Sequence, residues 1–233
     1  MSNRTLTYAI PLWDVPSVPV VESGAAFPVR RIYCVGRNYA EHTREMGGDP
    51  TREAPFFFMK PADAIVPNGA KIPYPVKTKD VHHEIELVVA MKSGGVDIPV
   101  ERALEHVFGY GVGIDLTRRD LQGEAKKAGK PWDMGKGFDR SAPCTALVPA
   151  TKIGHPSKGA IWLKVNGQTK QSGDLAQMIW SVPEMISYLS GLVELKSGDL
   201  LYSGTPAGVG PVAKGDRIEG HVDGVGDLAI SIV

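Results

Sequence analysis

The sequence has little cysteine, no long apolar run and no excess of either charge. Its 233 residues include two cysteines, Cys34 and Cys144. Two are too few for a disulfide framework, and both lie in short apolar segments typical of buried, reduced thiols. Lys and Arg together number 26, and so do Asp and Glu. This balance argues against nucleic acid or an anionic membrane as an electrostatic partner.

Long apolar stretches are also missing. The longest strictly apolar run is residues 87–91, whereas a membrane-spanning helix needs about 20 residues. The first residues lack the apolar core of roughly 7–15 residues that a secretory signal requires. We therefore expect no membrane segment and a cytoplasmic protein. Hydrophobic residues at 42% and charged residues at 22% indicate an ordinary globular chain with one large domain.

Turn-forming residues, in contrast, are abundant. With 27 glycines and 18 prolines between short apolar runs, the pattern predicts a β-rich α+β fold with a few short helices. Residues 1–28 contain Pro11, Pro16, Pro19 and Pro28, which oppose regular helix and strand ladders. We therefore expect an N-terminal arm or small subregion at 1–28 and the body of the protein at 29–233.

Local patterns place the elements of that body. The predicted strands are 31–35, 56–60, 83–91, 108–115, 144–148, 161–165, 199–203, 217–222 and 228–233. Short helices are expected at 39–46, 100–107, 119–128 and 183–190, with Asn38 as a cap of the first. Asn166-Gly167 between two strand-like segments predicts a tight hairpin.

Three carboxylates form the first candidate site. Glu84 and Glu86 are two residues apart in a predicted strand, so their side chains leave the same face. On this spacing alone they could equally face solvent. Asp115, at the end of the next apolar strand, strengthens a metal interpretation, because three carboxylates suit Mg²⁺ or Mn²⁺, and Ca²⁺ less well. His82 and His83 could draw Zn²⁺ instead, but His83 points to the opposite face and His82 is at best a neighbour of the ligands.

A histidine–carboxylate pair is the second candidate. His42 and Glu45 lie at i and i+3 on a predicted helix, within hydrogen-bond reach. A histidine oriented by a carboxylate is a plausible general base near neutral pH, although a surface ion pair is the commoner outcome of this spacing. Arg37 precedes the pair at a strand-to-helix turn, where site residues often lie, so we count it as a substrate-binding candidate.

Further polar candidates follow Asp115. Arg119 and Gln122 can present a guanidinium and an amide on one helical face, a suitable receptor for a substrate carboxylate. The lysines after them, Lys126 among them, are interpreted as a solvated helix face. Lys136 lies between two glycines in a predicted tight loop, which favours a substrate-facing role.

A glycine-rich loop at 203–210 follows a predicted strand. It lacks the lysine and the following helix of a phosphate-binding loop. We interpret it as a backbone nest, with Thr205 as a hydroxyl donor.

Taken together, these motifs resemble the fumarylacetoacetate hydrolase family, and within it the small acylpyruvate hydrolases, particularly the bacterial fumarylpyruvate hydrolases. The resemblance spans about residues 30–233. It is carried by Gly36-Arg37-Asn38-Tyr39 with His42 and Glu45, His83-Glu84-x-Glu86, Asp115 with Arg119-Asp120, Lys136-x-Phe138-Asp139, and Gly204-Thr205-Pro206-x-Gly208-Val209-Gly210.

The resemblance implies a catalytic domain with a rolled mixed β-sheet, a homodimer and a β-diketo acid substrate. It implies Mg²⁺ or Mn²⁺, with Ca²⁺ conceivable in vitro, held by residues matching Glu84, Glu86 and Asp115. His42 and Glu45 would activate water. Substrate contacts are implied for Arg119, Gln122, Lys136 and Thr205, with Lys136 stabilising the oxyanion.

The implied reaction is metal-dependent C–C hydrolysis of an acylpyruvate, foremost fumarylpyruvate to fumarate and pyruvate in gentisate degradation. Within the same fold, oxaloacetate decarboxylation or tautomerisation, or a general acylpyruvase activity, are alternatives. A non-catalytic, metal-stabilised binding protein is the alternative from a different class. The histidine pair favours hydrolysis, because decarboxylation needs no activated water.

Overall fold

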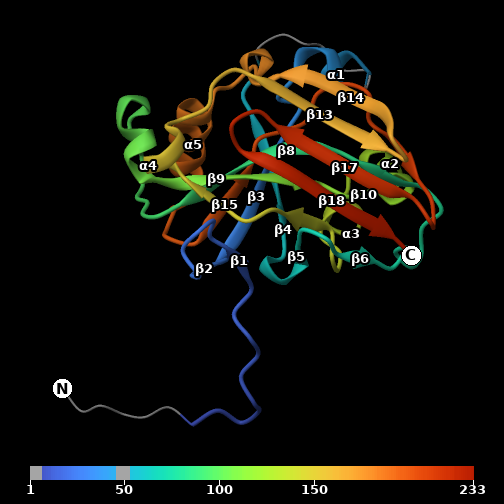
Figure 1. Cartoon of the computed structure of the whole chain (residues 1–233), viewed down its shortest axis with the longest axis horizontal. Helices are drawn as coiled ribbons and strands as arrows, with labels where there is room; N and C mark the ends of the chain where they lie inside the picture. The colour runs from blue at the N-terminus through green and yellow to red at the C-terminus, as the bar shows by residue number, and fades with distance from the viewer. Residues whose placement is uncertain (1–6, 46–52) are drawn as a thin grey trace.

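The computed structural model describes residues 7–45 and 53–233, and the following architecture concerns these residues (Figure 1). The strands are β1 Ser17–Pro19, β2 Ala26–Pro28, β3 Arg31–Gly36, β4 Phe56–Lys60, β5 Ile65–Pro67, β6 Lys71–Ile72, β7 Val81–His83, β8 Ile85–Met91, β9 Val107–Ile114, β10 Thr117–Arg118, β11 Ala142–Cys144, β12 Val148–Pro149, β13 Ala160–Val165, β14 Gln168–Asp174, β15 Asp199–Tyr202, β16 Gly210–Val212, β17 Arg217–Val222 and β18 Gly226–Ile232. The α-helices are α1 Ala40–Glu45, α2 Arg119–Lys127, α3 Asp133–Lys136, α4 Ala150–Ile153 and α5 Val182–Leu192, and the 3₁₀ helices are η1 Ala62–Ala64, η2 Val100–His106 and η3 Leu175–Gln177.

Two sheets make up most of the molecule. The larger is mixed and has the strand order β4-β3-β15-β8-β9-β11-β5, with β12 also paired to β9. The smaller has the order β14-β13-β17-β18-β6, and Figure 1 shows its strands lying across β8 and β9. The result is the β-rich, curled mixed sheet with few short helices that the sequence predicts.

Strand β8 lies at the centre because both of its faces are apolar and buried. Ile85, Leu87 and Val89 join the large core that extends to the smaller sheet. Val88 and Ala90 face a second cluster on the other side of the larger sheet. A strand covered on both faces reads as a continuous apolar run rather than as an alternating one, which explains the unbroken stretch at 87–91.

The predicted strand 83–91 is wrong in one respect, because it breaks at Glu84. β7, which precedes the break, belongs to a three-stranded sheet with β10 and β16, whereas β8 belongs to the larger sheet. At the break, the backbone carbonyl of Glu84 accepts a hydrogen bond of 2.8 Å from the amide of Asp115. The chain therefore changes sheets between the two glutamates, and this connection brings Asp115 beside them.

Several boundaries also differ from the predictions. The first helix begins at Ala40, and Met46, its predicted end, lies outside the described residues. Asn38 does not cap this helix, since its side chain bonds to other segments. The helix predicted at 100–107 is the 3₁₀ helix η2, and the strand predicted at 144–148 splits into β11 and β12. The hairpin at Asn166-Gly167 is confirmed: both residues have positive φ angles between β13 and β14.

The remaining expectations concern cysteines, membranes and the N-terminus. Cys34 and Cys144 are both free and buried, as predicted. No helix within the described residues is long and apolar enough to cross a membrane. β1 and β2 pair with each other, and residues 7–16 contain no helix or strand. The division into an arm and a body stays a prediction.

Candidate active site

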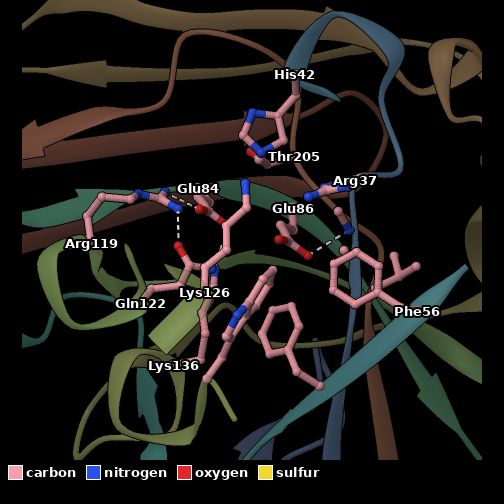
Figure 2. A pocket seen from close by; sticks show the side chains of 15 residues that line it. Arg37, His42, Phe56, Glu84, Glu86, Arg119, Gln122, Lys126, Lys136 and Thr205 are labelled. Atoms are coloured by element: carbon pink, nitrogen blue, oxygen red, sulfur yellow. Dashed lines mark hydrogen bonds and ion pairs between the residues drawn. The ribbon is translucent and has the colours of Figure 1, made fainter. Parts of the chain in front are cut away.

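A pocket opens beside the start of β8. It is lined by residues from most of the segments singled out in the sequence (Figure 2). The lining comprises Val35, Gly36, Arg37, His42, Phe56, Phe58, Glu84, Glu86, Arg119, Gln122, Lys126, Trp132, Lys136, Gly204 and Thr205. Every predicted substrate-binding residue is among them, and so are two of the three predicted metal ligands. The pocket therefore brings together residues that are up to 170 positions apart in the chain.

The three predicted metal ligands do form a cluster. Each of Glu84, Glu86 and Asp115 offers a carboxylate oxygen, and these oxygens all lie within 4.8 Å of one another. All three residues are buried, with Asp115 fully enclosed. Neither His82 nor His83 belongs to this group: the ring nitrogen Nδ1 of His83 lies 3.0 Å from Gln171 instead. The cluster is thus an all-oxygen donor set.

Two lysines provide positive charge in the cluster. The ammonium of Lys136 donates hydrogen bonds to Glu84 at 2.8 Å, to Asp115 at 2.6 Å and to the hydroxyl of Thr117 at 2.7 Å. On the other side, the Nζ of Lys60 lies 2.7 Å from Oδ1 of Asp115. Both lysines are almost fully buried. A buried ammonium needs such partners, since desolvation otherwise favours its neutral form.

The carboxylates differ in how well they are compensated. For Glu84, burial opposes ionisation, but Lys136 and Arg119 outweigh it and hold the pKa of this carboxyl well below its usual range. Burial and the nearby charges of Asp115 and Glu84 raise the pKa of Glu86 well above its usual value. For Lys136, burial lowers the pKa, yet attraction to Asp115 and Glu84 raises it overall. Glu86 is therefore the carboxylate whose charge this chain leaves least neutralised.

This imbalance fits a small divalent cation. Glu86 accepts a 2.7 Å hydrogen bond from the Gly204 amide, but no lysine or arginine bonds to it within the described residues. Oδ1 of Asp115 lies beside Lys60 without a hydrogen bond of good geometry. Glu84, Glu86 and Asp115 would hold the ion, because hard oxygen donors in a buried, electron-rich cluster are what Mg²⁺ and Mn²⁺ prefer.

The histidine–carboxylate pair lies opposite this cluster. Nδ1 of His42 is 3.1 Å from Glu45, and the His42 ring points into the pocket above Thr205 (Figure 2). His42 is buried, with 6% exposure, whereas Glu45 is exposed, so the histidine side of the pair faces the protein interior and not solvent. The backbone amide of Gly208 donates to both oxygens of Glu45, at 3.1 and 3.2 Å. The glycine-rich loop thus fixes the carboxylate that orients the histidine.

The substrate-binding candidates surround these two groups. Arg119 donates to Glu84 and, at 2.6 Å, to the amide oxygen of Gln122, which leaves the Gln122 amide N–H groups for a ligand. The guanidinium of Arg37 lies 5.8 Å above the ring of Phe56. Thr205 accepts a 2.8 Å hydrogen bond from Gln171, so its own hydroxyl proton remains available as a donor. Their roles toward substrate stay predictions.

The structure adds residues that the sequence interpretation missed. Lys126 is exposed, as expected of a solvated face, yet it also lines the pocket. It lies four residues after Gln122 and seven after Arg119, and this helical spacing could have identified it. The aromatic residues Phe56, Phe58 and Trp132 form a wall that no sequence motif signals. Lys136 ends the short helix α3 rather than sitting in a loop.

Gly135, directly before Lys136, has a packing reason. A Cβ atom at Gly135 would lie 2.9 Å from the backbone and side chain of Gln122. This glycine lets α3 approach α2, so Lys136 and Gln122 can reach the same pocket. Gly135 is thus explained by helix packing and not by a substrate-facing loop.

Asn38 joins the segment that carries His42 to the rest of the site. Its amide nitrogen donates to the backbone carbonyls of Trp180 at 2.9 Å and Ser203 at 2.8 Å, and its amide oxygen accepts from the Trp180 amide at 2.7 Å. Asn38→Ala removes all three bonds and leaves buried backbone groups unpaired, so we expect a loss of about 3 kcal/mol in the free energy of unfolding. Urea denaturation measures it. Exposed Asn68→Ala is the control, and an equal effect of both substitutions would contradict this assignment.

The fold agrees with comparisons to known proteins. Residues 31–233 match the family model "Fumarylacetoacetate (FAA) hydrolase C-terminal", and the chain belongs to this family of enzymes. The crystal structure of fumarylpyruvate hydrolase from Pseudomonas aeruginosa in complex with Mn²⁺ and pyruvate is 52% identical. It has a TM-score of 0.96 and covers 97% of this chain and 99% of that chain.

Other relatives carry different activities in their names. The human mitochondrial oxaloacetate tautomerase FAHD1 is 43% identical over 203 residues, covering 87% of this chain and 91% of the relative. A mitochondrial oxaloacetate decarboxylase of Dictyostelium discoideum is 40% identical over 206 residues, 88% of this chain and 94% of the relative. The family therefore includes hydrolases, decarboxylases and tautomerases, and the specific reaction must be argued from the site.

Proposed function

We propose that this protein hydrolyses the C–C bond of an acylpyruvate, foremost fumarylpyruvate to fumarate and pyruvate, within gentisate degradation. The observation that carries the proposal is the His42–Glu45 pair, held by Gly208 above the carboxylate cluster. A base aimed at a cation site is what a reaction with an activated water requires. The likeness to the Pseudomonas fumarylpyruvate hydrolase over 97% of the chain supports it.

His42 would act on the attacking water. Because Nδ1 lies against the Glu45 carboxylate, the proton sits on Nδ1 and Nε2 is free to accept a proton from water. The resulting hydroxide adds to the C4 carbonyl carbon of the substrate. When the C3–C4 bond breaks, its electron pair stays on C3 as a pyruvate enolate, and protonated His42 can return the proton to C3.

A divalent ion, Mg²⁺ or Mn²⁺, held by Glu84, Glu86 and Asp115 would act as a Lewis acid that stabilises the negative charge of the enolate. Lys136 holds the carboxylates of Glu84 and Asp115 in place through its hydrogen bonds. All three of its N–H donors are directed to residues of this chain. Lys136 can stabilise the C4 oxyanion, as the resemblance implies, only by releasing one of these bonds.

The polar groups of the pocket suit a substrate with two carboxylates. Arg119 and Gln122 lie beside the carboxylate cluster, where they would hold the carboxylate at C1. Lys126 is further along α2, where it would meet the carboxylate of the fumaryl group. The aromatic residues Phe56, Phe58 and Trp132 line the same pocket, and their flat apolar surfaces would suit a planar, conjugated carbon chain.

Oxaloacetate tautomerisation or decarboxylation is the second candidate, and its support is the 43% identity to the human tautomerase and the 40% identity to the Dictyostelium decarboxylase. Those reactions need the cation site and a proton donor but no attacking water. In that case the Glu45–His42 pair would serve in proton transfer to or from C3 only.

Parallel turnover measurements test these proposals. Fumarylpyruvate, acetylpyruvate and oxaloacetate are supplied with Mg²⁺, with Mn²⁺ and with chelator. We expect metal-dependent cleavage that prefers fumarylpyruvate. Faster turnover of oxaloacetate would transfer the assignment to the second candidate. If no substrate is turned over while a chelator lowers the melting temperature, the protein is a metal-stabilised binding protein.

Substitution of Lys126 tests the placement of the second carboxylate. Lys126→Met should raise KM for fumarylpyruvate roughly tenfold, the effect of one lost charge-assisted contact of about 1.5 kcal/mol. KM for acetylpyruvate, which has only the C1 carboxylate, should change little. Lys127→Met, on the next residue of the same helix, is the matched control because Lys127 does not line the pocket. Equal effects on both substrates would place Lys126 outside the recognition of the fumaryl group.

A further inference from the structure

Two cavities meet at the aromatic side of the pocket. The second, smaller cavity has a volume of about 30 Å³. It is lined by Gly36, Arg37, Thr43, Glu53, Ala54, Pro55, Phe56, Ile179 and Trp180. Three of these residues, Gly36, Arg37 and Phe56, also line the pocket, so they form a partition between the two spaces. Because Gly36 has no side chain, the partition consists mainly of the Phe56 ring and the Arg37 guanidinium.

The ring of Phe56 is held in the partition by three neighbours. It packs on the backbone of Gly36, the residue paired with it across β3 and β4. The guanidinium of Arg37 lies over the face of the ring. The rings of Phe56 and Trp132 are nearly perpendicular, at 87°, with their centroids 5.3 Å apart, which is a favourable arrangement for two aromatic side chains. These contacts give the ring a defined position.

The absence of a side chain at Gly36 makes room for this ring. A Cβ atom at Gly36 would lie 2.0 Å from the ring carbon Cζ of Phe56, and the three atoms nearest to that Cβ position all belong to Phe56. Gly36 does not have a positive φ angle, so its backbone conformation does not itself require glycine. The residue at position 36 therefore determines where the Phe56 ring can lie.

The partition lies at the side of the pocket that the acyl group of a substrate would reach. Figure 2 shows Phe56 across the carboxylates of Glu84 and Glu86 from Arg119 and Gln122, which would hold the carboxylate at C1. A substrate anchored at Arg119 thus extends its acyl group toward Phe56. Thin acyl groups such as acetyl and fumaryl can lie along the ring, whereas an aryl group needs the space that the ring occupies.

We propose that Phe56 determines the acyl specificity of the site by closing the pocket against aroylpyruvates such as benzoylpyruvate. Without the ring, the pocket opens into the second cavity, whose lining includes the apolar residues Ala54, Pro55 and Ile179. The phenyl group of a substrate then fits the space that the phenyl group of Phe56 leaves, because an apolar cavity of matching size binds an aromatic ring. This specificity rests on the proposed function, since it names the substrate class of the same site.

Replacing Phe56 by alanine tests this limit in the turnover assay. The ratio of kcat/KM for benzoylpyruvate to kcat/KM for acetylpyruvate should rise at least about tenfold, because the variant no longer excludes the aryl group. Met59→Ala is the matched control, since Met59 lies on the same strand and is 47% exposed but lines neither cavity. An unchanged ratio in Phe56→Ala, or an equal rise in the control, would overturn the proposal.

The packing of the ring on Gly36 is tested by a double-mutant cycle. Gly36→Ala should lower the melting temperature of the parent, because the added methyl group collides with the Phe56 ring. The same substitution in the Phe56→Ala variant should leave the melting temperature unchanged. An equal loss in both backgrounds would show that the ring does not occupy this place and would remove the partition.

A binding measurement separates the role of Phe56 from the proposed function. The ligands are the two α-keto acids that match acetylpyruvate and benzoylpyruvate but lack the C4 oxygen, so neither can be hydrolysed. In titration calorimetry with Mn²⁺ present, Phe56→Ala should bind the phenyl-bearing acid at least about tenfold more tightly relative to the methyl-bearing acid. If the parent cleaves no acylpyruvate, the hydrolase assignment fails, yet this shift still identifies Phe56 as the limit. An unchanged affinity ratio would reject Phe56 whichever reaction the protein catalyses.

Discussion

Replacing Glu86 by glutamine is expected to abolish divalent-metal binding and turnover together. Glu86 is the carboxylate that the chain's own cations neutralise least, so it contributes most to the affinity for an added cation. We expect Mn²⁺ to bind at least about 100-fold more weakly and kcat to fall by roughly 10³-fold or more. Titration calorimetry with Mn²⁺ and the turnover assay measure the two effects.

The same substitution should not destabilise the metal-free protein. Burial beside Asp115 and Glu84 raises the pKa of Glu86, so the carboxyl ionises more easily in the unfolded chain than in the folded one. The resulting loss in the free energy of unfolding is absent below the pKa that Glu86 has in the unfolded chain, and it grows as pH rises above that pKa. With chelator present, Glu86→Gln should therefore melt no lower than the parent at pH 7, with a smaller difference near pH 4.5. Scanning calorimetry at the two pH values measures this.

Glu219→Gln serves as the matched control, since Glu219 lies on β17 in the smaller sheet, away from the cluster. It should change neither metal affinity nor turnover. An active Glu86→Gln variant that binds Mn²⁺ normally would refute the ligand assignment. A variant that melts far below the parent without metal would show that Glu86 has a structural role instead.

Replacing His42 by alanine should leave metal binding intact and remove hydrolysis. His42 lies across the pocket from the three carboxylates and contributes no ligand to their cluster. Loss of a general base costs about 10²–10⁴-fold in kcat. We therefore expect the kcat for fumarylpyruvate to fall while the affinity for Mn²⁺, measured on the same preparation, stays unchanged. Full hydrolytic activity in this variant would exclude His42 as the base.

Oxaloacetate turnover by the same variant tells the two candidate functions apart. If His42 serves only to activate water, His42→Ala retains any decarboxylation while hydrolysis is lost. If both activities fall equally, His42 transfers protons in both reactions. His106→Ala is the control, because His106 bonds to Ser93 outside the pocket.

The sequence alone predicted the fold class and most of the polar residues that gather in the pocket, but not its aromatic wall or Lys126. The spacing of Glu84 and Glu86, and that of His42 and Glu45, identified two local pairs of residues. The structure brings these two pairs into one site. The prediction that both glutamates belong to one continuous strand was wrong, however. A single strand would have put both side chains on one face, whereas the chain changes sheets at Glu84, and a long-range hydrogen bond with Asp115 accompanies that change.

Other features were outside the reach of sequence patterns because they depend on distant partners. The cation beside Asp115 comes from Lys60, which is 55 residues away and follows three phenylalanines that suggest only a core strand. Asn38 looks like a helix cap because capping is the local use of asparagine. Its actual partners, Trp180 and Ser203, are more than 140 residues further along.

The glycine-rich loop links the two halves of the site mechanically. One of its amides holds Glu86 in the carboxylate cluster, and another, four residues later, holds Glu45 behind the histidine. At Gly208, a φ of +94° and the carbonyl of Lys170, 2.0 Å from where a Cβ would lie, exclude any side chain. The length of this loop therefore sets the gap between cation site and base, and gaining or losing one residue there would change both at once. Substrate size in such a site is thus constrained by backbone spacing as well as by the side chains that line it.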